Sequence, residues 1–244
     1  MPSGSVTRNN SSCYSFEEFM QGWCHRLELL SGEITAAVQG KNSEVREIEA
    51  RQLIARALGH FEEYFEHKSR AANLNVFALF SPTWCTSFEC AFLWVSGFRP
   101  RVLLQLVSDS IFDLTPDQSC ALDWLKRETK MNEKLVSDEL ARIQETAAAP
   151  PLMDAIREAA YPAEGHTFDM SREPIEQLRA SLEAVVANAD SLRVTTGAKV
   201  AEILTPPQCL RFLVAAIRLL QEMRSKGMQI ENLNGWDGLK TFMN

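Results

Sequence analysis

The sequence has 244 residues, enough for one large domain or two small ones. Of these residues, 45% are hydrophobic and 23% are charged, which is typical of a globular protein with a substantial core. The formal net charge is −7, whereas a protein that contacts many phosphates needs a concentrated positive field, so direct DNA binding by this chain alone is not expected. The two most apolar stretches, 88–107 and 209–220, contain charged residues, and neither is predicted to span a membrane.

The cysteines and the N-terminus both argue against a secreted protein. The six cysteines include no C-x-x-C pair, and in a long, helix-rich chain they are typical of buried or incidental thiols in a reducing compartment. Residues 1–12 are small and polar, without the apolar segment of a secretory signal, and we expect them to form a disordered tail.

Two amphipathic helices are predicted near the N-terminus. Apolar side chains between Phe16 and Ile34 recur at steps of three and four, which places them on one face of a helix. A turn at 40–42 separates them from a second apolar series, Ile48 to Phe65, whose opposite face is charged.

Proline and glycine predict the next boundaries. Ser81-Pro82 is typical of a helix start, with serine as N-cap and proline at the first helical position. That helix is expected to end at Gly97–Pro100, because the residue before a proline is pushed out of the helical region. A short apolar helix is predicted from Val102 to Val107.

Two similar capping boxes predict the starts of two long helices. Thr115–Gln118 and Thr205–Gln208 each pair a threonine with a glutamine three residues later. The first helix is expected to run to about Ala147. The second is expected to end at Gly227, a favourable C-cap, which would leave 228–244 as a C-terminal tail.

Between the two boxes lie two predicted linkers and one further helix. Pro150-Pro151 and 161–170 are typical of linkers, and a nearly heptad stripe runs from Ile175 to Leu192. Thr195–Gly197 fits either a turn between short strands or a continuing helix, and we favour the helix. The sum predicts an all-α protein, a single bundle of about eight helices over residues 13–227.

No catalytic or metal site is predicted. The tract His60–His67 carries histidines seven residues apart, about 10.5 Å along a helix, so both cannot ligate one zinc ion, and a solvated helical face is favoured. There is no Gly-rich phosphate loop and no G-x-S-x-G motif, so we do not expect an enzyme. The aromatic run is expected to be core rather than a ligand pocket; it comprises Phe77, Phe80, Trp84, Phe88, Phe92, Trp94 and Phe98.

Three ordered blocks resemble a plant family. Trp84-Cys85-Thr86-Ser87, followed by residues 92–100, is similar to the W-x-T-S and F-L-W-I-G-G-F-R-P blocks of TGA-type bZIP transcription factors. Residues 189–208 resemble the family's A-D-x-L-R, T, R-I-L-T and R-Q series, with Pro207 in place of the usual arginine. Phe16 to Trp23 stands where these proteins carry an acidic–aromatic segment. The shared region is the DOG domain, named for the Delay of Germination proteins.

The resemblance implies a set of mainly structural motif residues. These are Trp84, Trp94, Gly97, Phe98, Arg99, Pro100, Asp190, Leu192, Arg193, Thr205 and Gln208. Among them, Arg99 is expected to bond free helix-end carbonyls in the turn before Pro100.

The resemblance also implies a function. A Delay of Germination-type protein would be a non-enzymatic regulatory adaptor in abscisic-acid signalling and seed dormancy or stress control, binding type-2C protein phosphatases in the nucleus and cytoplasm. The relation to TGA factors implies an alternative, a transcriptional co-regulator that works through an NPR-type coactivator or a bZIP partner, since no basic region or leucine zipper is expected here. A haem or lipid sensor is the third hypothesis. Haem binding in some relatives is linked to C-terminal histidines, and no histidine follows His166, so no cofactor is expected.

The first helix carries the predicted partner site. Phe16, Phe19 and Trp23 step by three and four onto one face, and Glu17 and Glu18 flank it and favour the helix start through its dipole. Two interpretations are open: this face packs on the bundle, or part of it docks into a groove on a partner. The segment matches the phosphatase-docking stretch of the Delay of Germination proteins, which favours docking.

Overall fold

Helices make up nearly all of the computed structural model, which describes residues 10–40, 45–150, 153 and 173–242. They are α1 (Asn10–Gln39), α2 (Val45–Phe80), α3 (Ser87–Cys90), α4 (Arg101–Ser110), α5 (Pro116–Ala147), α7 (Glu173–Ile203) and α8 (Pro206–Phe242). Within these described ranges there are seven helices and no strand, which confirms the predicted all-α class and comes close to the expected eight helices.

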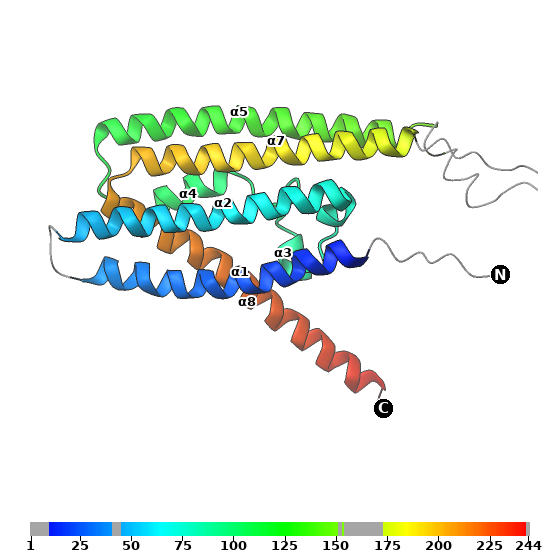
Figure 1. Cartoon of the computed structure of the whole chain (residues 1–244), viewed down its shortest axis with the longest axis horizontal. Coiled ribbons are helices and arrows are strands. Elements are labelled where there is room, and N and C mark those ends of the chain that lie inside the picture. The colour runs from blue at the N-terminus through cyan, green and yellow to red at the C-terminus, as the bar shows by residue number, and fades with distance from the viewer. Residues whose placement is uncertain (1–9, 41–44, 151–152, 154–172, 243–244) are drawn as a thin grey trace, which may run out of the picture.

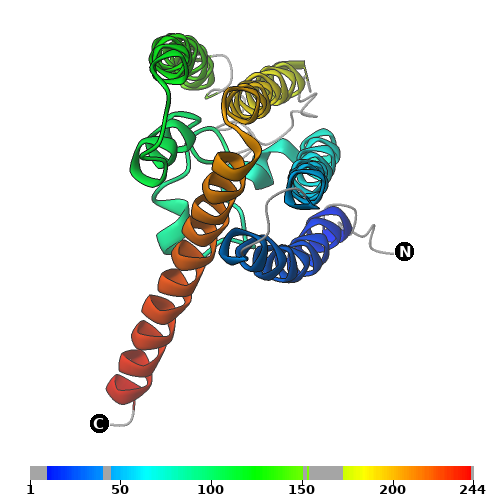
Figure 2. The same ribbon diagram turned by 90° about the vertical axis from the view of Figure 1, so that its left-hand side faces the viewer.

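Four long helices lie side by side along the molecule, and a fifth crosses them. Figure 1 shows the axes of α1, α2, α7 and α5 nearly parallel, with α1 antiparallel to α2 beside it and α7 antiparallel to α5 beside it. Helix α8 contacts α1, α2, α3 and α4 and then projects from the bundle towards the C-terminus, as Figure 2 shows from the side.

The core consists of two clusters of buried side chains. One joins α1, α2, α4 and α8 with the first half of α5 and the end of α7, and it includes fully buried residues such as Ile34, Val107 and Ile217. The other joins the start of α1 to the end of α2, to α7 and to the 82–95 segment, and includes Trp84 and Trp94. Because both family-motif tryptophans lie in the second cluster, this end of the bundle contains the candidate site.

The two predicted capping boxes begin α5 and α8 and are bonded to one another. Thr115 Oγ1 accepts from the Gln118 backbone N–H (3.2 Å), and Gln118 Oε1 accepts from the Thr115 N–H (3.0 Å). At the second box, Gln208 Oε1 accepts from the Thr205 N–H (2.9 Å). Gln118 Nε2 also donates to Gln208 Oε1 (2.8 Å), so the two caps hold the starts of α5 and α8 together.

The predicted helix start at Ser81-Pro82 is wrong. Helix α2 extends to Phe80, past the last residue of the predicted apolar series, Phe65, with a break in helical geometry at Asn75. The next helix begins only at Ser87, because Thr86 forms a complete capping box with Glu89, and it lasts four residues. The residues between the two helices are non-helical, with Pro82 buried.

Both ends of the chain are more helical than expected. Helix α1 begins at Asn10, inside the expected tail 1–12, and residues 1–9 lie outside the described part. Helix α8 does not end at Gly227 but continues to Phe242, through most of the expected C-terminal tail. Gly227 is buried against α3, and a Cβ added there would lie 2.7 Å from Thr86 Cβ. Glycine is therefore required here for close packing rather than for a helix end.

Three further predictions concern the continuity of α7, the two linkers and the aromatic run. Helix α7 runs without interruption through Thr195–Gly197, as we favoured. Pro151 and 161–170, expected as linkers, lie outside the described residues. The aromatic run is only partly core, because Phe77, Phe80 and Phe92 are exposed, whereas the two tryptophans in it are buried.

Candidate functional site

A tight turn at residues 94–97 forms the centre of the first family block. The Trp94 N–H donates to the Gly97 carbonyl (2.6 Å), and the Gly97 N–H donates to the Trp94 carbonyl (3.2 Å). Val95 and Ser96 have φ of 46° and 59°, the left-handed region that side chains other than glycine, asparagine and aspartate rarely adopt. Such a backbone is kept only where its surroundings hold it in place.

Arg193 of α7, from the second family block, holds this turn. Its Nε donates to the Phe98 carbonyl (2.8 Å), and its Nη2 donates to the carbonyls of Trp94 and Val95, the latter at 3.0 Å. Gly97 lies directly against the guanidinium, since a Cβ there would be 2.8 Å from Arg193 Cζ. The two motif blocks, far apart in sequence, are therefore two halves of one structural unit.

A buried charge network extends from Arg193 to α2. Asp190 accepts from Arg193 and also from Lys68 Nζ (2.7 Å), and the Lys68 side chain is only 2% exposed. Burial lowers the pKa of Lys68 to about 8, although the Asp190 carboxylate opposes that shift. The network ties α2, α7 and the 94–97 turn together.

Trp94 is buried as expected, and its partners correct the prediction for Arg99. Its Nε1 donates to Ser137 Oγ (2.9 Å), and the guanidinium groups of Arg99 and Arg193 lie 5.2 and 5.4 Å from its ring centre. Arg99 does not bond the turn carbonyls, because Arg193 occupies that position. Its Nη1 lies 3.6 Å from the carboxylate of Glu133 instead.

The other motif residues have structural surroundings. Pro100 is buried and stands as the N-cap of α4, Phe98 is half-buried, and Leu192 packs against the second core cluster. Trp84 is buried, and its carbonyl accepts from Arg224 Nη1 of α8 (2.9 Å).

The aromatic face of the first helix packs into the bundle. Phe16 is buried, with its ring edge-on to Trp84 at 4.8 Å, and Phe19 stacks on His67 at 3.9 Å. Trp23 is also buried; it stacks on His60 at 4.7 Å, and its Nε1 donates to the His60 carbonyl (2.9 Å). Phe16 and Trp23 are thus unavailable to a partner in this structure.

Two further expectations for this region change. Glu17 and Glu18 are the eighth and ninth residues of α1, about two turns from its start at Asn10, so the helix dipole does little for them. Glu18 is exposed, while Glu17 is half-buried and accepts from Thr83 Oγ1 (3.4 Å). The histidines expected on a solvated face are half-buried against aromatic rings, and burial lowers the pKa of His60.

Two buried charged residues were missed by the sequence analysis, Lys68 and Glu133. Glu133 is fully buried in α5 and accepts from the backbone N–H of Arg101 (2.8 Å) and from its Nε (2.6 Å). Lys68 continues the apolar face of its helix at a step of four after Tyr64, and Glu133 lies three residues before Val136 on the same face of its helix. That position was the signal that could have identified them.

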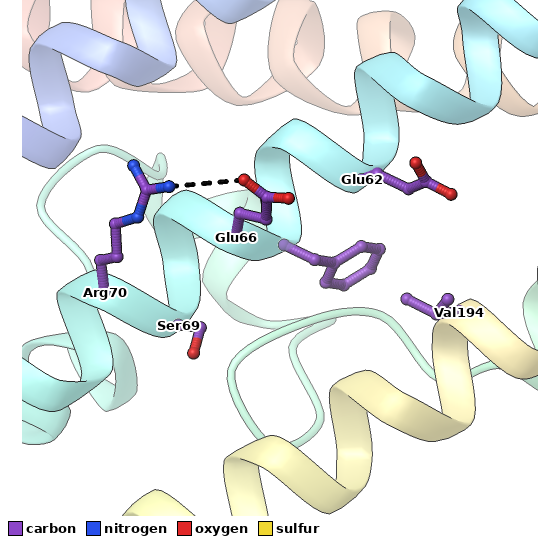
Figure 3. Close-up of a pocket in the computed structure, with 6 residues that line it drawn as sticks. Glu62, Glu66, Ser69, Arg70 and Val194 are labelled. Atoms are coloured by element: carbon purple, nitrogen blue, oxygen red, sulfur yellow. Dashed lines mark hydrogen bonds and ion pairs between the residues drawn. The ribbon is translucent and has the colours of Figure 1, made fainter.

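An open groove of about 500 Å³ lies between α2 and α7 on the outer surface (Figure 3). Its apolar wall is Phe65 and Val194, and its polar rim includes Glu66, which accepts from Arg70 Nη2 (3.4 Å). Within the described ranges, no three metal-ligating side chains come together, and no helix has the length and apolar character needed to cross a membrane.

The family model and the known proteins that are similar to this chain indicate the same family. A family model described as seed dormancy control, DOG1, matches residues 30–109. The Arabidopsis thaliana protein RESPONSE TO ABA AND SALT 1 is 34% identical over 227 residues, 91% of this chain and 98% of that protein. Protein ZW2 of the same plant is 30% identical, over 89% of this chain and 98% of its own length. Transcription factor TGA7 is 33% identical over 92% of this chain, which spans 58% of that factor. The chain therefore belongs to the plant DOG-domain family, whose domain the TGA factors share in their C-terminal region.

Proposed function

We propose that this protein is a non-enzymatic regulatory adaptor in the plant response to abscisic acid and salt, acting by binding type-2C protein phosphatases in the nucleus and cytoplasm. The observation that carries the proposal is the match to RESPONSE TO ABA AND SALT 1 over nearly the whole of both chains. The family model described as seed dormancy control, which matches residues 30–109, supports a regulatory role in the plant.

The chemistry of the buried charges supports a binding role rather than catalysis. Lys68, Asp190 and Arg193 are bonded to each other and to backbone carbonyls, and Glu133 is bonded to Arg101. Buried ionisable groups with such partners serve to fix the fold, whereas a catalytic group must reach a substrate. The proposal involves no cofactor, because no histidine follows His166, and a visible absorbance spectrum after addition of haem tests that part of it.

The structure changes how phosphatase docking through α1 can be tested. Replacing Trp23 would remove a buried, hydrogen-bonded ring and disturb the bundle, so a loss of binding would be ambiguous. Glu18 is exposed and Glu17 is half-buried with one long hydrogen bond from Thr83, so replacing them disturbs the core less than replacing Trp23 does. We therefore propose the double substitution Glu17→Arg with Glu18→Arg, and Glu28→Arg, exposed further along the same helix, as the matched control.

The experiment is a pull-down of purified type-2C phosphatases by the purified full chain. The proposal expects binding by the wild type and the control, and weaker binding by the double variant with an unchanged melting temperature. Binding by none of the phosphatases would refute the proposed partner. Undiminished binding by the double variant would mean that the docking site lies elsewhere than at the start of α1.

A transcriptional co-regulator is the second candidate, favoured by the similarity to TGA7. It would reach DNA through a bZIP factor or an NPR-type coactivator, because the acidic chain lacks the positive field that phosphates require. A gel-shift experiment distinguishes the two: this candidate expects no shift by the chain alone and a further shift when it is added to a bZIP–DNA complex.

A further inference from the structure

Helix α5 carries a row of large apolar side chains on its solvent side. Trp124, Met131 and Leu135 are 54%, 61% and 59% exposed, although each is an apolar residue of a kind usually found in a core. Their spacing of seven and four places them on one face of the helix, hereafter the α5 face. The opposite side of α5 packs on α7 and α4 through buried residues such as Leu125 and Val136. Figure 2 shows α5 at the edge of the bundle, with α7 on one side and solvent on the other.

Basic side chains border the α5 face along the edge that lies away from α7. They are Arg127, Lys130 and Lys134, all exposed. Lys134 is paired with Asp138 (2.5 Å) on the same helix. Arg127 and Lys130 make no ion pair with a described residue, so this edge is locally positive on a protein of net charge −7.

On the other edge of the α5 face, an ion pair with α7 neutralises the charge of Glu128. Glu128 accepts from Lys199 Nζ of α7 (2.7 Å), and the same ammonium group lies 5.3 Å from the centre of the Trp124 ring. The contact with Lys199 restricts the rotamers of the Trp124 side chain before any partner binds. Anchors that are ordered in advance lose less entropy on binding.

We propose that the α5 face docks an amphipathic helix of a partner protein whose apolar side is bordered by aspartate or glutamate. The inference rests on the proposed function, in that it specifies the chemistry of the protein that an adaptor of this kind binds. The three anchors lie 11 helical rises apart from first to last, about 16 Å, which matches an apolar stripe of roughly three turns on the partner. Arg127 and Lys130 then face its acidic border, and complementary charge sets orientation and selects partners.

A second copy of the chain fits the α5 face less well than an acidic helix. If two α5 faces met as antiparallel helices across a two-fold axis, the same border of each would lie against the other. Arg127 and Lys130 would then oppose the basic residues of the second copy, and like charges across an interface are unfavourable.

The test uses two fluorescein-labelled model peptides of about 18 residues, roughly five helical turns. Both carry leucines at helical steps of three and four. One carries glutamates along one border of the leucine stripe, and the other carries lysines at the same positions. Fluorescence anisotropy with the full-length protein is expected to show saturable binding of the glutamate peptide and binding of the lysine peptide weaker by about tenfold or more.

Variants locate the binding on the molecule. Met131→Ala with Leu135→Ala is expected to weaken binding of the glutamate peptide by about tenfold or more. Leu29→Ala, an equally exposed leucine on α1, is the control and should leave it unchanged. Arg127→Glu with Lys130→Glu should reverse the preference, so that the lysine peptide binds better. All these residues are exposed, so melting temperatures should stay close to that of the wild type.

Three results would overturn the proposal. The first is equal binding of the two peptides, or glutamate-peptide binding that survives the change of Met131 and Leu135. The second is binding to phosphatidylserine vesicles, lost in these same variants, without discrimination between the peptides, which would make the α5 face a membrane contact. The third is a dimer in sedimentation that these variants dissociate.

The same preparations separate this inference from the proposed function. A wild type that binds a phosphatase but neither peptide refutes the α5 proposal alone. A wild type that binds no phosphatase, yet discriminates the peptides as expected, refutes the proposed partner and supports the α5 proposal.

Discussion

Arg193 donates a hydrogen bond to the carbonyl oxygen of Trp94, and its guanidinium also lies 5.4 Å from the centre of the Trp94 ring. The two residues are 99 positions apart, one in each of two family motifs. One side chain thereby fixes both the backbone of the 94–97 turn and the ring that anchors it. The motifs are consequently best understood as a folding unit that holds α7 against the connection between α3 and α4.

The first prediction concerns Arg193. Arg193→Met leaves Asp190 with one cation fewer and removes the donors to three carbonyls, so we expect the free energy of unfolding to fall by about 3–5 kcal/mol. Urea unfolding followed by circular dichroism measures this. Arg211→Met, which breaks an exposed pair with Asp113, is the control and should cost about 1 kcal/mol or less. A similarly small loss of stability for Arg193→Met would mean that the 94–97 turn is stable without the hydrogen bonds from Arg193.

The second prediction concerns Ser96, which stands where the family pattern has glycine. Its φ of 59° is unfavourable for serine, and its buried Oγ has no hydrogen-bond partner among the described residues. Ser96→Gly is expected to raise the free energy of unfolding by about 0.5–1 kcal/mol, seen as a higher melting temperature. Val95→Gly is the contrasting change, because it relieves the same backbone but removes a buried side chain, and it should be destabilising. A lower melting temperature for Ser96→Gly would contradict the assignment of strain.

The third prediction concerns the contact between α8 and α3. The methyl group of Gly227→Ala would lie 2.7 Å from Thr86 Cβ, so the helices must move apart, at a cost of about 1–3 kcal/mol. Gly59→Ala is the matched control within α2, since nothing lies within 4 Å of a Cβ there. That control should stabilise the protein by about 0.5–1 kcal/mol, because alanine is the better helix former. Equal effects of the two substitutions on the melting temperature would show that α8 does not pack closely at Gly227.

The fourth prediction concerns the pH dependence that Lys68 gives the fold. Its pKa of about 8 in the folded protein is below the ordinary 10.5, because burial disfavours the ammonium form. Between these two values the unfolded chain binds more protons than the folded one, so the contribution of Lys68 to stability increases as pH rises from about 8 to 10.5.

Lys68→Met isolates this effect from the cysteines and Tyr64, whose raised pKa values act in the opposite direction at high pH. The stability of the wild type relative to Lys68→Met should rise by about 2–3 kcal/mol across that range. The readout is chemical unfolding at a series of pH values. A difference that stays constant with pH would mean that the Lys68 pKa is not lowered.

The sequence predicted the helices more reliably than their ends. Local chemistry was sufficient at Thr115 and Thr205, because a capping box depends on residues three positions apart. It failed at Ser81, where Thr86 offered a competing box, and at Gly227, where a glycine that looks like a helix end serves a contact with a segment 141 residues earlier (227 minus 86). Such long-range contacts leave no trace in a local pattern.

The same distinction applies to the site. Motif resemblance identified Trp94, Arg193 and Asp190. It did not predict that the Arg193 side chain would donate hydrogen bonds to the backbone of the turn that begins at Trp94. The aromatic spacing from Phe16 to Trp23 correctly placed these rings on one face, and spacing alone could not show whether the bundle or a partner covers it. Lys68 escaped notice because a charged residue on an apolar face is usually interpreted as solvated.

Calorimetric titration of the purified chain into a purified type-2C phosphatase most directly tests the proposal that this protein acts by binding a phosphatase. We expect saturable heats of binding for the wild type, with weaker binding for Glu17→Arg/Glu18→Arg and no change for Glu28→Arg. The absence of binding heat at several temperatures, for a wild type whose circular dichroism shows the folded bundle, would contradict it.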